Sequence, residues 1–332
     1  MDNLCHTLVG AALAEAGLRK RTPLAAAALV IGANLPDLDG LAYFLAGPDE
    51  ALGFRRGWTH GILAVPLWPF VLSGALVAWD RSVRRRRDPA AAPADPRVLW
   101  WLSALAVLTH PLLDLLNTYG VRLLMPFRDV WYYGDTLFIV DPWVWLALGA
   151  GYLLSSRRRR RGAPGAGRPA AWALALSGAY VVAMAAGTLA SRAVARNEMA
   201  ARGVPVDRLM VGPLPATPFR RQVVVGSGTR YHRGTVDLLR SPRYRDDAPP
   251  MLERSSDGPE ALTAARTREG ALFLHWARFP VFMVDRAARP PRVAIVDLRY
   301  TLDPGAGFGA LSVSLPGAIP SSGASANQEP HP

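Results

Sequence analysis

The sequence predicts an α-helical membrane domain of about five to six spans, followed by a small β-rich domain. The first 191 residues hold several apolar segments, and a helix needs about 20 mostly apolar residues to cross a bilayer. Clusters of arginine separate these segments, and the rest of the chain has short β-prone runs. The expected parts are a membrane domain at 1–191, a β-rich domain at 192–316 and a disordered tail at 317–332.

Hydropathy locates the individual spans. Five segments are mostly apolar over close to the length that a bilayer requires, and a sixth segment at the N-terminus is shorter and more weakly apolar. The five are 23–45, 60–79, 98–118, 138–154 and 170–191, and the sixth is 3–18.

The net charge of +12 raises nucleic-acid binding as an alternative. Much of the excess, however, lies in short loops between spans, where basic residues mark the cytoplasmic side. These loops alternate, which favours a multi-pass protein of the plasma (inner) membrane and no nucleic-acid partner. Both chain ends, and with them the β-rich domain, are then extracytoplasmic. The clusters are RKR at 19–21, RSVRRRR at 81–87 and RRRRR at 157–161.

The cysteine content limits the kinds of metal site that the chain can build. Cys5 is the only cysteine, so neither an intramolecular disulfide nor a thiolate zinc cluster can form. A metal would have to be held by imidazole and carboxylate groups. We interpret Cys5 as an apolar filler of a helix.

Ionisable residues inside apolar segments are functional candidates, because charge within a span is costly. His110 and Asp114 stand four residues apart in LTHPLLDLL, on one face of a helix. Asp37 and Asp39 stand close together in GANLPDLDG, at the end of another span. For the separate motifs, a helix cap and a hydrogen-bonded structural histidine remain alternative interpretations.

Two further histidines belong to other segments. His60 opens a candidate span in RRGWTHG, where an interfacial histidine is the alternative, and His6 lies in the weak first segment. In the topology set by the arginines, all these side chains fall toward the outer ends of their spans. At about 1.5 Å per residue, His110, Asp114 and the Asp37/Asp39 pair lie within roughly 12 Å of the outer boundary. Four segments are thus predicted to bring ionisable groups to one depth.

Imidazole and carboxylate groups that converge in this way indicate a divalent metal, zinc first, with manganese or iron as alternatives. His6 is either an additional ligand or a proton shuttle. Threonines next to the histidines, and Asn34 and Asn117, are available to orient the ligands. The candidate metal ligands are Asp37, Asp39, His60, His110, Asp114 and His6.

The combined motifs resemble the membrane-bound metal-dependent hydrolase family of the YdjM-like, LexA-regulated type. The resemblance covers roughly residues 1–190, and the stretch 277–300 resembles the soluble tail of longer members. It implies a multi-span α-helical membrane protein and a metal-dependent hydrolase. The motifs are His6-Thr, Asn-x-Pro-Asp37-x-Asp39, Arg-Gly-x-Thr-His60 and Thr-His110-Pro-x-x-Asp114.

A fainter similarity extends to zinc-dependent phospholipase C and related nucleases, which also carry His-x-x-x-Asp on a helix. This similarity implies a phosphoester substrate. The chain lacks most of the other histidines of those enzymes, which speaks against a cluster of three metal ions.

The aromatic loop at 119–137 allows two interpretations. It is either an interfacial belt that anchors the neighbouring spans or a lid near the lipid, in which Arg122 or Arg128 binds a phosphate. Asp135 or Asp141 could also reach a metal centre.

The C-terminal region is expected to form strands, bounded by glycine and proline. The stretch 241–260 is polar and proline-rich and is expected to be a mobile loop, and the tail after Pro316 has the composition of a disordered segment. The expected strand segments are 221–227, 234–239, 271–279, 280–285 and 293–300.

Two functional hypotheses follow. The first is a membrane enzyme that uses metal-activated water on an ester or phosphoester, which could be derived from a lipid, at the outer face. The second is a non-catalytic membrane protein with a structural metal, or with a polar network that conducts protons or ions. Conduction needs ionisable groups in the cytoplasmic half as well. The cytoplasmic halves of the predicted spans are almost entirely apolar, and Glu15 is the exception. The enzyme hypothesis is therefore favoured.

Overall fold

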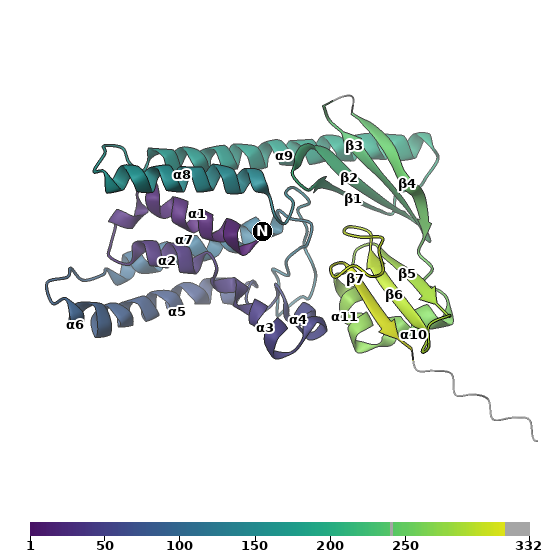
Figure 1. Ribbon diagram of the computed structural model, residues 1–332, viewed down its shortest axis with the longest axis horizontal. Coiled ribbons are helices and arrows are strands. Elements are labelled where there is room, and N and C mark those ends of the chain that lie inside the picture. Colours follow the sequence, from purple (N-terminus) through teal and green to yellow (C-terminus); the bar gives the residue numbers. More distant parts are fainter. Residues whose placement is uncertain (240–241, 316–332) are drawn as a thin grey trace, which may run out of the picture. The chain divides into compact units, whose positions relative to one another are not determined.

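The computed structural model describes residues 1–239 and 242–315 and divides the chain into two compact units (Figure 1). The first unit is Met1–Glu253 and the second begins at Arg254. The domain boundary expected between residues 191 and 192 remains a prediction. The tail predicted at 317–332 lies outside the described residues.

The first unit contains a helical region, as predicted. Two of its long helices begin at the same signal: Asp95 caps one and Asp141 the other, and each is followed by a proline at the first helical position. The helical elements are α1 (Asn3–Glu15), η1 (Leu18–Lys20), α2 (Ala25–Gly32), η2 (Leu35–Leu41), α3 (Ala42–Leu45), α4 (Pro48–Phe54), α5 (Ala64–Trp79), η3 (Asp80–Arg84), α6 (Arg85–Arg87), α7 (Pro96–Leu115), α8 (Pro142–Arg160) and α9 (Arg168–Ala201).

Among the described residues, α7 and α9 are each long and apolar enough to cross a membrane. The pair Ala25–Gly32 and Leu35–Leu45 passes the same test when taken together, although it is bent by 47° at the break. The structure thus has two to three candidate spans. The five to six predicted from hydropathy remain a prediction.

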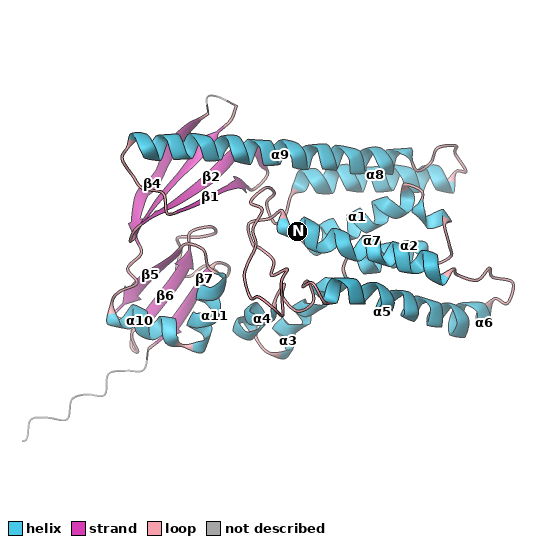
Figure 2. Cartoon of the chain, turned by 180° about the vertical axis from the view of Figure 1, so that it is seen from behind, coloured by secondary structure: helices cyan, strands magenta, loops and turns pink. Residues whose placement is uncertain are grey.

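The helix α9 extends past the predicted end of the membrane domain. Its apolar run stops near residue 191, but the helix continues to Ala201, where Ala195 and Met199 are buried against a sheet. Figure 2 shows this sheet beside the end of α9. Its antiparallel strand order is β1–β2–β3–β4, and the strands are β1 (Arg208–Leu214), β2 (Thr217–Ser227), β3 (Arg230–Asp237) and β4 (Arg243–Glu253).

The prediction of a mobile loop at 241–260 is wrong for residues 243–253, which form β4. Pairing with β3 and the burial of Tyr244 hold this polar segment in the sheet. Residues 240–241 lie outside the described part of the chain.

The second unit is a three-stranded antiparallel sheet, in the order β5–β6–β7, with two helices. The strand predicted at 271–279 is wrong, because residues 271–276 belong to a helix. Thr267 caps that helix, and Phe273 and Trp276 are buried one turn apart. The elements are α10 (Pro259–Arg266), α11 (Arg268–Trp276), β5 (Pro280–Asp285), β6 (Arg292–Asp297) and β7 (Ala310–Ser314).

In the helical region, α1 lies between the α8–α9 pair and the helices α2 and α7 (Figure 1). Two buried clusters fill the space on either side of it. One joins α1 to α2, α5 and α7, and the other joins α1 to α8 and α9. The contact between α1 and α2 is close at Gly10, where a Cβ atom would lie 2.5 Å from the carbonyl oxygen of Leu29.

We expect Gly10→Val to destabilise the protein by about 1–3 kcal/mol, because the extra side chain meets backbone that cannot rotate away. Thermal unfolding in detergent measures this effect. Gly74→Val on α5 is the matched control, since a Cβ atom there meets nothing within 4 Å. Equal melting temperatures for the two variants would contradict this account of the α1–α2 contact.

Candidate metal centre

Four side chains that are distant in the sequence meet at one point in the first unit. They are Asp37, His60, His110 and Asp114, and each offers one ligand atom within 4.8 Å of the other three. His60, His110 and Asp114 are fully buried, and Asp37 is 9% exposed. The cluster can hold a metal ion.

The separations of the donor atoms fit tetrahedral coordination. His60 Nε2 lies 3.1 Å from His110 Nε2 and 3.3 Å from Asp114 Oδ2. His110 Nε2 lies 3.6 Å from Asp114 Oδ2. Asp37 Oδ1 lies 3.7 Å from His110 Nε2 and 3.8 Å from His60 Nε2. A tetrahedron with metal–ligand distances of about 2.0–2.1 Å has edges of about 3.3–3.4 Å.

The local fold explains how these residues converge. His110 and Asp114 stand one turn apart on α7, so they face the same neighbours. Asp37 lies in η2, directly after the chain breaks out of α2. The same break exposes the carbonyl of Ala33, which lies 2.6 Å from His110 Nδ1. The bend therefore supplies both a donor and an orienting group.

The hydrogen bonds fix which nitrogen each histidine turns toward the centre. A carbonyl can only accept, so Nδ1 of His110 carries the proton that it donates to Ala33, and Nε2 has a free lone pair. The hydroxyl of Thr59 donates to Asp39, at 3.0 Å, and therefore accepts from Nδ1 of His60, at 2.8 Å. Two imidazole lone pairs thus face each other across 3.1 Å, an arrangement that a cation stabilises.

The carboxylates point to a cation as well. Both oxygens of Asp37 and Oδ2 of Asp114 are buried without a hydrogen-bond partner, although Oδ1 of Asp37 is ion-paired with Arg55. Leaving buried charged acceptors without such partners is costly. Asp37 and Asp114 face the two bare imidazole nitrogens, so the donor set suits zinc, and it also suits other divalent metals that accept nitrogen and oxygen ligands.

Asp39, a predicted ligand, lies outside the four-donor cluster. Its Oδ2 accepts from the Arg56 backbone N–H at 2.7 Å and from Thr59, and it lies 3.4 Å from His60 Nδ1. Its Oδ1 accepts from Arg55. This is the position of a carboxylate that orients a metal-binding histidine from the side away from the metal.

His6 also lies beside the cluster and is not one of the four donors. Its ring stacks on that of His110 with 3.8 Å between centroids, and its Nε2 lies 3.3 Å from Asp114 Oδ1. Neither ring nitrogen has a hydrogen-bond partner.

Two arginines with no role predicted from the sequence also contact the carboxylates, beside the N-terminal ammonium of Met1, which pairs with Asp114. Arg56 is buried and contacts Asp114 Oδ1 at 3.1 Å, together with Asn117 Oδ1 and the carbonyl of Gly120. Arg55 contacts Asp37 at 3.0 Å. Burial alone would lower the pKa of Arg55, but the carboxylates of Asp37 and Asp39 raise it, so Arg55 stays charged. Arg56 is the first residue of the Arg-Gly-x-Thr-His60 motif and Arg55 directly precedes it, which was the available signal.

Three of the remaining candidates in and after the loop 119–137 have structural partners, namely Arg122, Asp135 and Asp141. Arg122 is buried, pairs with Asp129 at 3.0 Å and donates to the carbonyls of Gly53 and Arg55. Asp141 caps α8, Asp135 pairs with Arg192 at 3.3 Å, and Arg128 is exposed. The four-donor cluster therefore includes neither Asp135 nor Asp141.

We expect Asp39→Asn to lower the affinity for Zn²⁺ by about 10- to 100-fold without abolishing binding, because it removes a partner that orients His60. Competition titration with a chromogenic chelator measures the dissociation constant. Asp129→Asn, a carboxylate that pairs with Arg122, is the control. A loss as complete as that of a ligand variant would show that Asp39 binds the metal directly.

Comparison with known proteins gives a family match over the membrane region. A family profile described as YdjM inner membrane protein matches residues 1–190, more than half of the chain. The chain is also similar to the uncharacterized protein YfhP of Bacillus subtilis (strain 168), with 26% identity over 159 residues. That alignment spans 44% of the chain and 44% of the relative. No solved structure matches.

Proposed function

The chain belongs to the YdjM inner membrane protein family, and we propose that it is a metal-dependent hydrolase. The observation that carries the proposal is the convergence of two bare imidazole nitrogens and two carboxylate oxygens within 4.8 Å. Asp37, His60, His110 and Asp114 would hold the ion, zinc first, with manganese or iron as alternatives. When bound, such an ion lowers the pKa of a bound water toward neutrality and makes hydroxide available.

The side of the centre beside Asp37 is where substrate would approach. The side chain of Asp37 is 2% exposed, and those of the other three donors are fully buried. Arg55 binds Asp37 there, and its side chain is 16% exposed, so it can contact an anionic group that arrives from outside. A guanidinium at this place suits the negative charge of a phosphoester.

The overall reaction is hydrolysis of an ester or phosphoester. The oxygen of water bonds to the carbon or phosphorus atom, the bond to the leaving oxygen breaks, and an acid and an alcohol result. Asp39 and Thr59 keep the ring of His60 in position, and Ala33 does the same for His110. The role of proton shuttle predicted for His6 is part of this proposal.

The predicted orientation is also part of the proposal. Asp37 follows the end of α2, and Asp114 lies in the last turn of α7. The basic segments 19–21 and 81–87 lie before α2 and before α7, at the opposite ends of the same helices. Because basic loops stay in the cytoplasm, the centre and the β-rich region are proposed to be extracytoplasmic.

The second hypothesis, a conducting network, finds less support. Toward the arginine clusters, a buried cluster of alanine and leucine side chains lies between α1, α2, α5 and α7, and the buried hydroxyls on these helices are those of Ser73 and Ser103. Glu15 at that end is bound by Arg19 and by Arg159, at 3.0 Å for the latter. A proton path would need polar groups through this core.

Hydrolysis of two chromogenic probes, bis-p-nitrophenyl phosphate and p-nitrophenyl acetate, tests the proposal with the full chain in mild detergent. We expect turnover that a chelator abolishes and zinc or manganese restores, and a loss of at least about 100-fold in Asp37→Asn. His232→Ala, a histidine of β3, is the control. A metal-loaded protein that turns over neither probe would favour a structural metal.

A further inference from the structure

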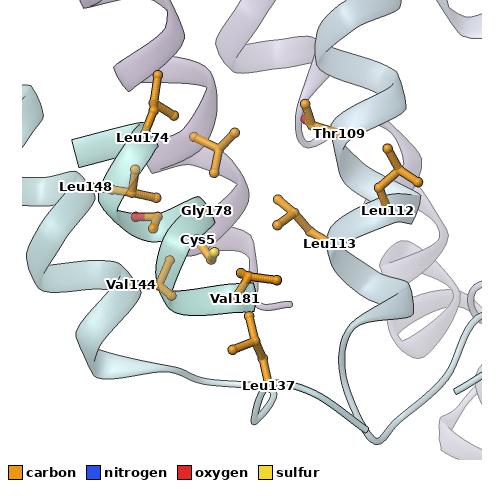
Figure 3. A pocket seen from close by; sticks show the side chains of 12 residues that line it. Cys5, Thr109, Leu112, Leu113, Leu137, Val144, Leu148, Leu174, Gly178 and Val181 are labelled. Carbon is orange, nitrogen blue, oxygen red and sulfur yellow. The ribbon is translucent and has the colours of Figure 1, made fainter. Parts of the chain in front are cut away.

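An apolar cavity of about 270 Å³ lies beside the metal centre, between α1, α7, α8 and α9. Figure 3 shows Leu113 of α7 and Val181 of α9 on opposite walls, with Cys5 of α1 behind them. Besides Cys5, the polar side chains in the lining are Thr109 and Ser177. The cavity is larger than the apolar hole of about 150 Å³ that admits a benzene molecule in a well-studied case.

The cavity and the metal centre share two helices at the same depth. Cys5, Thr109 and Leu113 line the cavity, and each directly precedes a residue of the centre or its immediate surroundings, namely His6, His110 and Asp114. Consecutive Cα atoms are about 3.8 Å apart. The cavity and the cluster therefore lie on adjacent sides of the same turns of α1 and α7.

The position of the cavity indicates what fills it. Its walls include α7 and α9, the two helices that are each apolar and long enough to cross a membrane. Only 17% of the apolar stretch of α9 is buried inside the protein. Its neighbouring side chains Leu176 and Val182 are 62% and 69% exposed. In a membrane protein such a face is in contact with lipid. The molecules that surround the cavity and can enter it are therefore lipid hydrocarbon chains.

One polar atom in the cavity lacks a partner. Thr109 Oγ1 donates to the carbonyl of Ala106 at 2.6 Å, but Ser177 Oγ is buried without any hydrogen bond. A second apolar cavity, of about 650 Å³, shares Val144 and Ser177 with the first and extends to Trp143 and Phe219. The hydroxyl thus stands between two hydrocarbon-lined spaces, where it can donate to an ester oxygen of an acyl lipid.

We infer that the cavity binds the hydrocarbon chain of the substrate, so that the substrate class is an acylated or alkylated ester or phosphoester drawn from the membrane. The inference rests on the proposed function. The metal centre receives the polar ester, and the chain lies between α7 and α9.

Binding is tested without any assay of activity. The full chain is reconstituted into vesicles of phosphatidylethanolamine and phosphatidylglycerol that contain phosphatidylglycerol with a diazirine midway along one chain. After irradiation, mass spectrometry locates the adducts. We expect them to concentrate on Cys5, Thr109, Leu113 and their neighbours. Gly178→Leu, which fills the cavity, should reduce these adducts by about fivefold or more.

Gly149→Leu on α8 is the matched control, since a Cβ atom at Gly149, as at Gly178, meets nothing within 4 Å. Adducts should be unchanged in that variant. Adducts spread evenly over the lipid-facing helices, α5 included, would mean ordinary surrounding lipid only and would overturn the inference. So would an unchanged pattern in Gly178→Leu.

A second comparison separates this inference from the proposed function. Octyl and methyl p-nitrophenyl phosphate share the reacting group and differ in the chain. Gly178→Leu should lower kcat/KM for the octyl compound by about tenfold and leave the methyl compound unchanged. Metal-dependent turnover with no chain preference, together with evenly spread adducts, would overturn the assignment of the cavity as a chain-binding site and leave the proposed hydrolase function standing. Concentrated adducts without turnover of either compound would overturn the proposed hydrolase function and leave lipid binding in the cavity standing.

Discussion

His110→Ala is expected to abolish stoichiometric binding of Zn²⁺, an effect larger than the loss of about 10- to 100-fold caused by removing an orienting partner. The imidazole of His110 supplies a bare Nε2 that lies 3.1 Å from His60 Nε2 and 3.6 Å from Asp114 Oδ2. Alanine leaves only three of the four donors, namely Asp37, His60 and Asp114. Competition titration of the detergent-solubilised protein gives the dissociation constant.

The control for this variant is another histidine change of the same size. His275→Ala removes an imidazole from α11, in the second compact unit, and should leave the affinity unchanged. A dissociation constant for His110→Ala within a factor of about ten of the wild type would be too small for a ligand and would contradict the assignment.

Arg56→Ala is expected to lower the free energy of unfolding by about 3–5 kcal/mol, the cost of removing one partner of a buried ion pair. The guanidinium contacts Asp114 Oδ1 at 3.1 Å and donates to Asn117 Oδ1 and the Gly120 carbonyl at 3.3 and 3.2 Å. Its loss takes one cation from Asp114, which keeps the N-terminal ammonium of Met1, and one donor each from Asn117 and from the Gly120 carbonyl. Equilibrium unfolding in mixed micelles, followed by tryptophan fluorescence, measures the change.

Arg128→Ala is the matched control, because Arg128 is exposed and surface substitutions usually change stability by no more than about 0.5 kcal/mol. The free energy of unfolding of Arg56→Lys should fall between those of the two alanine variants, since an ammonium keeps the charge but loses the two-pronged geometry of a guanidinium. An Arg56→Ala protein as stable as Arg128→Ala would mean that the buried contacts of Arg56 add nothing.

The family could be predicted from the resemblance of the combined motifs, and the residues that meet at the centre could be predicted for a physical reason. His110 and Asp114 are four apart on an apolar helix, and ionisable residues in such a segment are rarely incidental. The arginine clusters oriented the segments, and the orientation placed Asp37 and His60 at the same depth. The structure brings these four residues together.

The division of roles within the motif could not be predicted. Asp37 and Asp39 are two residues apart, and spacing cannot show which of them faces the metal. The 3₁₀ turn after Pro36 directs Asp37 to the imidazoles and Asp39 to Thr59 and Arg56. The parts played by Arg56 and Ala33 depend on a broken helix and a buried loop contact, which leave no periodic signal.

The differences between the predicted and the observed fold have similar causes. Residues 271–276 are apolar and aromatic, which suggested a strand, but the cap at Thr267 and the burial of Phe273 and Trp276 one turn apart select a helix. The apolar run of α9 ends near residue 191, whereas the helix continues because Ala195 and Met199 pack on a sheet that hydropathy cannot reveal.

The central claim is that Asp37, His60, His110 and Asp114 together hold one metal ion, and elemental analysis of the purified protein tests it most directly. The full chain in mild detergent is compared with the His60→Ala/His110→Ala double variant and with His232→Ala. The account predicts close to one divalent metal per chain in the wild type and in His232→Ala, and almost none in the double variant. A folded wild type without metal, or an equal metal content in the double variant, would contradict it.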